Sequence, residues 1–400
     1  ANSYVISAPG HYRIPLVYGN AIENGNDNQR AYISNAPTGT PNEMYVLRNF
    51  KDHLGNNITN PWIEKTNGGA NAGVDGAKIV WADEKDLVHL SASPIKQDGG
   101  NTYLDFEVKA ADIKSGNVVV AVTKGGTVVW SWHLWFAPKD ALDKIEVTNH
   151  QNVKYYFTKE ALGWKPTQWS GSTYSSARTV KVKVEQTVAN NGTKQVAVLN
   201  ITQNPGTVRR GITTLYQFGR KDAFPGTDTT PDGSFNANGG NNMSVTNGIQ
   251  HPETFYTWGS SWYNGYNQYN LWSMDNTTTD FNDNAVVKTV YDPCPAGFHM
   301  PASNAFTGIT ANGQNGGTTN VDGTDDWQTY VNNFGHNFWT SSSKTATIYF
   351  PAMGYRDAYG GFLYNVGDQG YYWAAVPDNA YRGCYMQFLS ALLYPLTDYG

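Results

Sequence analysis

Alternation of apolar and polar residues is the strongest pattern in the first part of the chain, up to about residue 135. A period of two is typical of strands that bury one face, and turn residues separate the runs. Gly125 and Gly126, for example, predict a hairpin turn. Short strands at this spacing favour a β-sandwich. Strands are expected at residues 4–6, 11–18, 77–81, 87–90, 102–108, 117–122 and 127–136.

The run at residues 127–136 carries the bulkiest apolar side chains. Alternation places Trp135 on the face opposite to its apolar neighbours. Packing inside a core is the ordinary role of such residues, whereas an exposed Trp135 would indicate an interface for a neighbouring subunit. Pro15 marks an edge strand or bulge, where such a subunit could add a strand. The side chains expected to share the other face of the run are Val128, Trp130, Trp132 and Leu134.

A second strand group is expected after residue 138. Val180, Val182 and Val184 alternate with charged residues, and the Asn-Asn-Gly sequence at 190–192 predicts a hairpin with residues 195–202. Pro205 and Gly206 follow the hairpin, and we place a domain boundary there. The predicted N-terminal all-β sandwich region is therefore 1–205, with possible strand groups at 1–137 and 138–205.

Residues 206–400 differ in composition, since Glu253 is the one glutamate among them. Residues 226–250 are rich in Gly, Asn and Thr and predict a long surface loop. Short helices are expected at 303–309 and at 325–335, where four apolar residues recur with helical spacing. This half is therefore predicted to be α+β, with long loops and short helices. Its strands are expected at 345–350, 370–375 and 384–388.

Composition excludes several classes of partner. The chain has 28 basic and 33 acidic residues, and no basic stripe accompanies this net charge of −5, which argues against nucleic acid. No apolar run approaches the roughly 20 residues that cross a bilayer, so no transmembrane segment is expected. Gly, Asn, Ser, Thr and Tyr dominate the surface, as is common on exported, sugar-facing proteins. If the chain is exported, its leader and any lipid-anchor cysteine lie upstream of Ala1.

Residues 291–301 predict a rigid loop. Pro293 and Pro295 flank Cys294, and Gly297 follows, which excludes a helix interior or a central strand. Such a loop points to recognition rather than chemistry. The second cysteine of the chain is Cys384. One bridge between the two cysteines and a pair of buried thiols are the alternatives.

Ordered motifs in the second half resemble the Fibrobacter succinogenes major paralogous domain, which occurs in surface lipoproteins of Bacteroidetes. The resemblance implies a C-type-lectin-like module and a fimbria-associated adhesin. The domain that this half resembles has an aromatic or aliphatic residue where this chain has Cys384. The resemblance therefore leaves undecided whether Cys294 and Cys384 form a disulfide. The motifs lie at residues 216–226, 270–272, 291–301, 350–355 and 370–373.

The first half resembles the fimbrillin-like proteins of the same bacteria. The matching pieces lie at residues 2–10, 16–20, 130–135 and 162–164. Together, the two resemblances cover most of the chain.

A glycan site is predicted within residues 258–272. This segment interleaves aromatic rings, on which sugars stack, with amides that pair with sugar hydroxyls. Packing in a core is the alternative role of these rings, and the resemblance implies it for Trp272. The candidate ligand-binding residues here are Trp258, Trp262, Tyr263, Tyr266 and Asn267.

A second candidate surface comes from two turns between expected strands, where binding residues often lie. Ordinary solvated turns are the alternative interpretation. The residues are Arg356, Asp357 and Tyr359 in the first turn, and Asp378, Asn379 and Arg382 in the second.

Neither a metal site nor a catalytic site is predicted, and no cofactor is expected. Pro377 and Asp378 resemble the Pro-Asp pair of calcium-dependent lectins, but Ca²⁺ needs six to eight oxygen ligands and no glutamate follows Glu253. No G-x-S-x-G, H-E-x-x-H or P-loop motif occurs. The enzymatic alternative is a relative of the sulfatase-activating enzymes, whose fold is related. It would require Cys294 and Cys384 to be exposed and reactive.

These observations predict a cell-surface or fimbrial adhesin that binds a glycan or protein ligand of a host or bacterial surface without covalent chemistry. Repetition on the surface would supply avidity. A structural subunit that assembles with other pilus subunits is the second alternative, and an enzyme on a lectin-like scaffold is the third. The expected location is extracellular, either fimbrial or anchored at the outer membrane.

Overall fold

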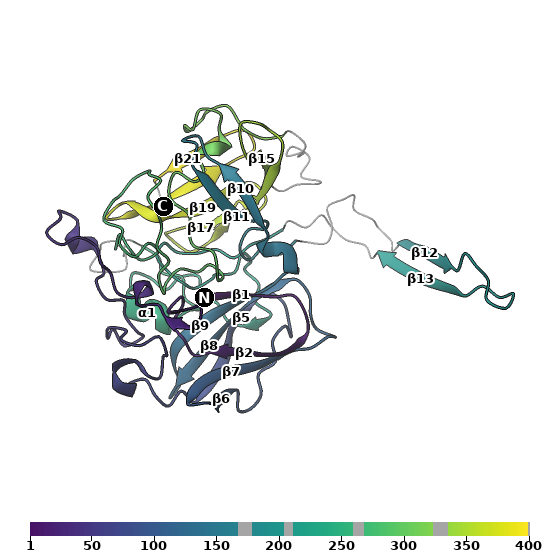
Figure 1. The fold of residues 1–400 in the computed structure, drawn as a ribbon, viewed down its shortest axis with the longest axis horizontal. Coiled ribbons are helices and arrows are strands. Elements are labelled where there is room, and N and C mark those ends of the chain that lie inside the picture. The colour runs from purple at the N-terminus through teal and green to yellow at the C-terminus, as the bar shows by residue number, and fades with distance from the viewer. Residues whose placement is uncertain (167–177, 204–210, 259–267, 323–334, 399–400) are drawn as a thin grey trace.

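The computed structural model describes residues 1–166, 178–203, 211–258, 268–322 and 335–398. The protein is mostly β-sheet with very few helices, so the β-rich prediction is confirmed. Figure 1 shows the strands within residues 1–136 in the lower part of the protein, and the strands within residues 335–397 in the upper part together with the hairpin at residues 144–158. Within the described ranges, no helix has the length and apolar composition needed to cross a membrane.

Two sheets of the first half enclose the largest core. The first sheet has the strand order β1-β9-β8-β5-β14, in which β1 runs parallel to β9, and the second has the order β2-β7-β6. Leu104 and Phe106 of β7 alternate with half-buried polar residues and face this core. The strands are β1 (Ser3–Ile6), β2 (Gly10–Pro15), β5 (Gly76–Ala82), β6 (Ile95–Asp98), β7 (Asn101–Val108), β8 (Gly116–Lys124), β9 (Thr127–Phe136) and β14 (Asp232–Gly233).

Strand β9 is buried on both faces, and a bulge corrects one sequence prediction. The register between β8 and β9 shifts after the pair Val122–Trp130, so Val129 is an extra residue in β9. Trp130, Trp132 and Leu134 therefore face the large core together with Val129. Val128 packs on the opposite face with Trp81 and Ala223, and its predicted placement beside Trp130 was wrong.

Trp135 is buried rather than exposed. Its Nε1 donates to the carbonyl oxygen of Trp164 at 3.0 Å, and its ring packs with Ala137 and Ala141. The alternative of an exposed Trp135 at a subunit interface is therefore wrong.

Residues from both sides of the boundary expected at residue 205 share the same hydrophobic cores. The hairpin of β10 (Lys144–Thr148) and β11 (Lys154–Thr158) packs on the second half, where Val147 shares a core with Phe306 and Phe388. Conversely, Ile249 of α1 (Val245–Gln250) and Tyr291 belong to the core of the first half.

The second half contains small antiparallel sheets. Part of the turn expected at 303–309 is found as the 3-10 helix η5, whereas the helix expected at 325–335 falls outside the described residues apart from Gly335, which begins β15. The elements are β15 (Gly335–Trp339), β16 (Thr347–Pro351), β17 (Tyr355–Arg356), β18 (Leu363–Tyr364), β19 (Gly370–Asn379), β20 (Arg382–Phe388), β21 (Leu393–Thr397) and η5 (Thr307–Ile309). The first half also has β3 (Ile22–Glu23), β4 (Asn26–Asp27), η1 (Gln29–Ala31), η2 (Glu43–Tyr45), η3 (Thr66–Gly69) and η4 (Lys139–Leu142).

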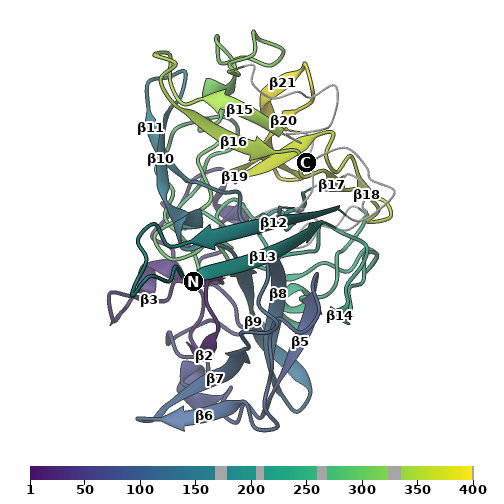
Figure 2. The same ribbon diagram turned by 90° about the vertical axis from the view of Figure 1, so that its right-hand side faces the viewer.

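The predicted hairpin after residue 177 forms, and Figure 1 shows it extended away from the rest of the protein. Figure 2 shows its two strands side by side, seen in front of the other elements. Its strands are β12 (Arg178–Glu185) and β13 (Val196–Gln203), and the positive φ angles of Asn191 and Gly192 fit the predicted tight turn. Cross-strand pairing gives the hairpin one apolar face, which is exposed. That face consists of Val180, Val182, Val184, Ala197, Leu199 and Ile201.

Candidate functional site

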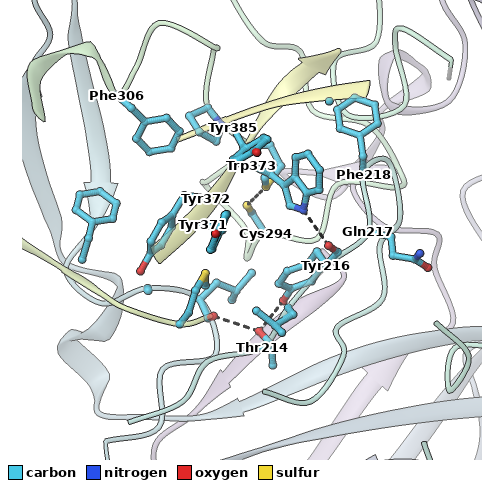
Figure 3. Close-up of a pocket in the computed structure, with 18 of the residues that line it drawn as sticks. Thr214, Tyr216, Gln217, Phe218, Cys294, Phe306, Tyr371, Tyr372, Trp373 and Tyr385 are labelled. Atoms are coloured by element: carbon cyan, nitrogen blue, oxygen red, sulfur yellow. Dashed lines mark hydrogen bonds between the residues drawn. The ribbon is translucent and has the colours of Figure 1, made fainter. Parts of the chain in front are cut away.

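A cavity of about 1480 Å³ lies between the β10–β11 hairpin and the strands β16 to β20. Trp135, Tyr155 and Phe157 line it from the first half, and the second half supplies most of the remaining wall. Figure 3 shows rings from several elements around this space. The volume exceeds the roughly 300–1,000 Å³ of common ligand pockets.

A continuous row of aromatic rings forms one wall of the cavity. Alternation in β19 puts Tyr371 and Trp373 on one face, and Tyr385 of β20 pairs directly opposite Trp373. Successive ring centroids lie 4.8–5.9 Å apart, within the usual range for aromatic pairs. The row runs in the order Tyr364, Tyr355, Tyr371, Tyr385, Trp373 and Phe218.

Polar atoms of the interior rings are engaged by the protein itself. Trp373 Nε1 donates to the carbonyl oxygen of Tyr216 at 2.8 Å. The hydroxyl of Tyr372 donates to the carbonyl oxygen of Pro351 at 2.7 Å, and that of Tyr371 donates to Gln369 Oε1 at 2.5 Å. These bonds fix the rings and leave their faces as the surface offered to a ligand.

At the mouth of the cavity, two candidate segments meet that lie about 100 residues apart in the chain. Trp258 and Tyr359 line the cavity and make an edge-to-face contact with centroids 4.5 Å apart. The backbone N–H of Trp258 donates to the carbonyl oxygen of Ala358 at 2.7 Å. This bond helps to hold Trp258 at a φ of 56°, a left-handed conformation that is unfavourable for a bulky residue. Both side chains remain about 60% exposed, at 59% and 63%.

Asp357 and Arg356 shape the mouth rather than offer free charges. Asp357 accepts hydrogen bonds from the backbone N–H groups of Tyr359, Gly360 and Phe362. Arg356 is buried, and its guanidinium donates to the carbonyl oxygens of Pro225, Thr227 and Gly361 and pairs with Asp228 at 3.2 Å. Arg356 lines the cavity but anchors the loop, which differs from its expected role as a ligand contact.

The remaining candidates divide into two groups. Asp378, Asn379 and Arg382 do not line the cavity, although Tyr381 in the same turn does. Burial, with the nearby carboxylates of Asp398 and Asp280, raises the pKa of Asp378. The other candidates, Trp262, Tyr263, Tyr266 and Asn267, lie outside the described residues. Trp272 is fully buried, and its Nε1 donates to the carbonyl oxygen of Tyr291, which is the packing role expected for it.

The Cys294–Cys384 disulfide does not form, and both thiols are free. Cys294 Sγ lies 3.7 Å from Met300 Sδ at the cavity wall. Cys384 is buried in β20 and does not line the cavity. Burial raises the pKa of both thiols, and nearby carboxylates raise both further. Neither environment favours the thiolate that a cysteine nucleophile requires.

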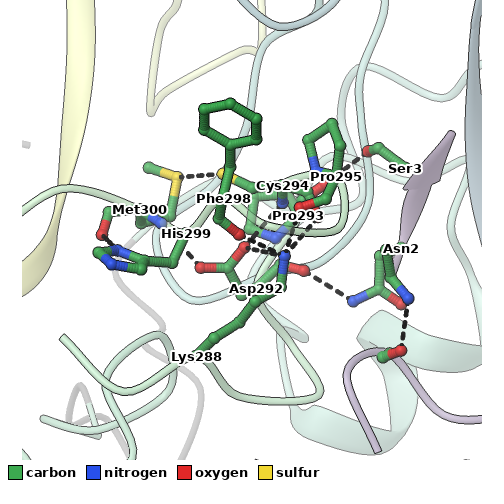
Figure 4. Close-up of polar contacts among 12 residues, drawn as sticks. Asn2, Ser3, Lys288, Asp292, Pro293, Cys294, Pro295, Phe298, His299 and Met300 are labelled. Atoms are coloured by element: carbon green, nitrogen blue, oxygen red, sulfur yellow. Dashed lines mark hydrogen bonds and ion pairs between the residues drawn. The ribbon is translucent and has the colours of Figure 1, made fainter. Parts of the chain in front are cut away.

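The loop 291–301 is organised by a buried carboxylate and an ammonium group rather than by its cysteine (Figure 4). Asp292 accepts hydrogen bonds from the backbone N–H groups of Cys294 and Met300 at 2.7 and 2.8 Å. Lys288 Nζ donates to three carbonyl oxygens of the loop and lies 3.5 Å from Asp292. Asn2 in the first half donates to the carbonyl oxygen of Asp292. The loop thereby connects the N-terminal strand to the cavity wall.

One arrangement that sequence analysis did not find resembles a catalytic triad. His133 lies 3.2 Å from Ser3 Oγ and 2.8 Å from Asn117 Oδ1, and Asn117 donates to Asp83. All four residues are buried, and the Ser3 hydroxyl donates to the carbonyl oxygen of Pro293 at 2.5 Å. The serine oxygen is therefore not presented to a substrate, and the network serves packing. Ser3 lies 130 residues from His133 in the sequence, so no local motif indicates the network.

Within the described ranges, no group of three or more His, Cys, Asp or Glu side chains is placed to hold a metal ion. No protein-family model, no curated protein and no solved structure matches this chain.

Proposed function

We propose that this chain is a surface-displayed adhesin that binds its ligand non-covalently at the aromatic mouth and cavity. The observation that carries the proposal is the convergence of Trp258 and Tyr359, two exposed rings held by local hydrogen bonds above an aromatic cavity. Large exposed rings on fixed backbone provide contact area at low entropic cost, as in many binding sites. A glycan or a protein loop on another surface fits this chemistry.

The state of the ionisable groups at the cavity favours binding over catalysis. Asp283 accepts hydrogen bonds from Tyr155, Asn149 and Asn304, and Asp357 is occupied by backbone donors. Cys294 has a raised pKa. A cysteine nucleophile requires a thiolate, which the raised pKa of Cys294 disfavours, and a general base requires a free lone pair aimed at the substrate, whereas the two carboxylates are directed at neighbouring donors.

The finer fold assignment belongs to the same proposal. We propose that the two sheets around the large core form a fimbrillin-like sandwich and that the second half is a C-type-lectin-like module. The ordered motifs in both halves support this, as do the small sheets and long loops of the second half. Display on a fimbria or at the outer membrane follows from the same resemblance.

Substitution at the mouth tests the function. Trp258→Ala and Tyr359→Ala are each expected to weaken binding to a responsive spot on a glycan array, or to a target cell, by about tenfold or more. Phe362→Ala is the matched control because Phe362 is 63% exposed in the same loop but does not line the cavity. Equal binding by all three variants and the parent would contradict the proposal.

The exposed hairpin β12–β13 favours a second candidate function, assembly with a neighbouring subunit. Its apolar face of six residues is exposed in the isolated chain and would be buried by a partner. Val182→Lys with Leu199→Lys should abolish any self-association seen by sedimentation velocity. Thr179→Lys with Asn200→Lys adds the same charge to the opposite face and should not. If Val182→Lys with Leu199→Lys sediments as the parent protein does, the hairpin is not a contact between copies of the chain.

A further inference from the structure

We propose that the interior of the cavity holds an acyl chain whose anionic head group lies at the cavity edge beside Lys144. This inference rests on the proposed function and deepens it, because it names the chemical class of ligand that enters the same site. Three observations carry it: the engagement of the interior polar atoms, the length of the aromatic wall, and the charge at the rim.

A sugar in the interior would need hydrogen-bond partners for its hydroxyls. Several of the polar atoms in the wall are instead engaged by the protein: Trp135 Nε1, Trp373 Nε1 and the Tyr372 hydroxyl each donate to a backbone carbonyl oxygen. The Tyr155 hydroxyl donates to the side-chain carboxylate of Asp283. A buried hydroxyl without a partner costs free energy, so this interior disfavours a hydroxyl-rich ligand. A methylene chain needs no such partner.

The shape of the wall suits a long, narrow ligand. The aromatic row from Tyr364 at the exposed end to Phe218 at the buried end joins rings from β18, β17, β19 and β20 and a loop. Phe306, which directly precedes η5, and Phe157 of β11 line the same space. Covering these rings with methylene groups removes apolar surface from water, which is favourable. An extended chain can contact many rings along the row.

The rim supplies a complementary charge for an anionic head. Lys144 is exposed at the cavity edge, and its ammonium lies over the Phe298 ring at 5.5 Å. Lys154, also at the edge, is paired with Glu146 at 2.8 Å. Asp283 and Asp357 also line the cavity, and each accepts hydrogen bonds from neighbouring groups. The exposed ammonium of Lys144 can pair with a carboxylate or phosphate head while the tail enters the cavity.

A chain-length series tests the inference on the full chain. Octanoate, decanoate and dodecanoate are titrated below their critical micelle concentrations and followed by tryptophan fluorescence and calorimetry. Affinity should rise by up to about fourfold for each added methylene, because each one adds buried apolar surface. Maltose and dodecyl maltoside form a matched pair, in which only the compound with the tail should bind with saturation.

Variants locate the binding. Ala161→Phe and Ala285→Trp place bulk in the cavity at positions that are not fully buried, and each should weaken dodecanoate binding by at least tenfold. Lys144→Gln should weaken dodecanoate binding severalfold and leave dodecyl maltoside binding unchanged. Val182→Lys with Leu199→Lys removes the exposed apolar face of the hairpin and should change neither.

The outcomes separate the inference from the proposed function. The acyl-chain proposal is wrong if the affinity for the fatty acids does not depend on their chain length. It is also wrong if Val182→Lys with Leu199→Lys abolishes dodecanoate binding. If Trp258→Ala still weakens glycan or cell binding in that case, the adhesin proposal stands without it. Vesicles of phosphatidylglycerol distinguish a membrane lipid from a free fatty acid as the source of the chain, and binding to either supports the inference.

Discussion

Replacing Asp292 by alanine is expected to lower the free energy of unfolding by about 3–5 kcal/mol. Asp292 is fully buried, and its two carboxylate oxygens accept the backbone N–H groups of Cys294 and Met300. The substitution leaves both donors without partners and removes the anion that lies 3.5 Å from the buried ammonium of Lys288. Each of these losses is costly in a buried site, and they act on the same loop.

Urea denaturation of the parent and the variant measures this effect. Asp357→Ala is the matched control, because Asp357 also accepts backbone N–H groups in a loop but is half-buried. Its expected cost is about 1 kcal/mol. Asp292→Asn keeps one acceptor and should fall between the parent and Asp292→Ala. Equal stability of Asp292→Ala and Asp357→Ala would contradict the role given to the buried carboxylate.

The same substitution links stability to the binding site. Cys294, Phe298 and Met300 line the cavity, and the Asp292–Lys288 pair fixes the loop that carries them. Conditions under which Asp292→Asn remains folded should therefore also show weakened ligand binding. The rigidity of this loop stays a prediction from its two flanking prolines, and the hydrogen bonds of Asp292 and Lys288, which the sequence does not reveal, support it.

Local features of the fold could be predicted because short-range rules decide them. The hairpin β12–β13 follows from alternation on both sides of an Asn-Asn-Gly turn, and no distant contact is needed to specify it. The burial of Trp272 also agreed with expectation. The prediction for Val128 shows the limit of reasoning from alternation, because it placed this side chain on the wrong face of β9. The bulge at Val129 depends on pairing with β8 and cannot be inferred from the sequence of β9 alone.

The candidate site could be predicted only in pieces. Trp258 and Tyr359 were each candidates, but their contact depends on a fold that brings together segments about 100 residues apart. Arg356 and Asp357 have the composition of a polar ligand site, yet carbonyl oxygens and backbone N–H groups of their own loops engage them. The aromatic row was hidden for the same reason, because its rings come from four strands and a loop.

Buried His133 is expected to make the protein less stable as the pH falls below about 6.5. Burial lowers the pKa of His133 to about 3, whereas the value in an unfolded chain is about 6.5. Between these values the unfolded chain binds a proton that the folded protein excludes. The free energy of unfolding therefore falls by up to about 1.4 kcal/mol for each pH unit, and His133 contributes nothing to this slope above pH 6.5.

Comparison with His133→Gln isolates this contribution from that of the carboxylates, which titrate in both proteins. Asn117 donates through Nδ2 to Asp83 and to the carbonyl oxygen of Gly163, so its Oδ1 accepts a hydrogen bond from the N–H group of His133 Nε2. Glutamine can place an N–H group near that position, and it cannot be protonated in this range. Urea denaturation at pH 8, 6 and 5 should show the stability difference between the two proteins shifting towards the variant as the pH falls. A difference that stays constant from pH 8 to pH 5, or an NMR titration of the His133 ring near pH 6.5 in the folded protein, would contradict a neutral, buried imidazole.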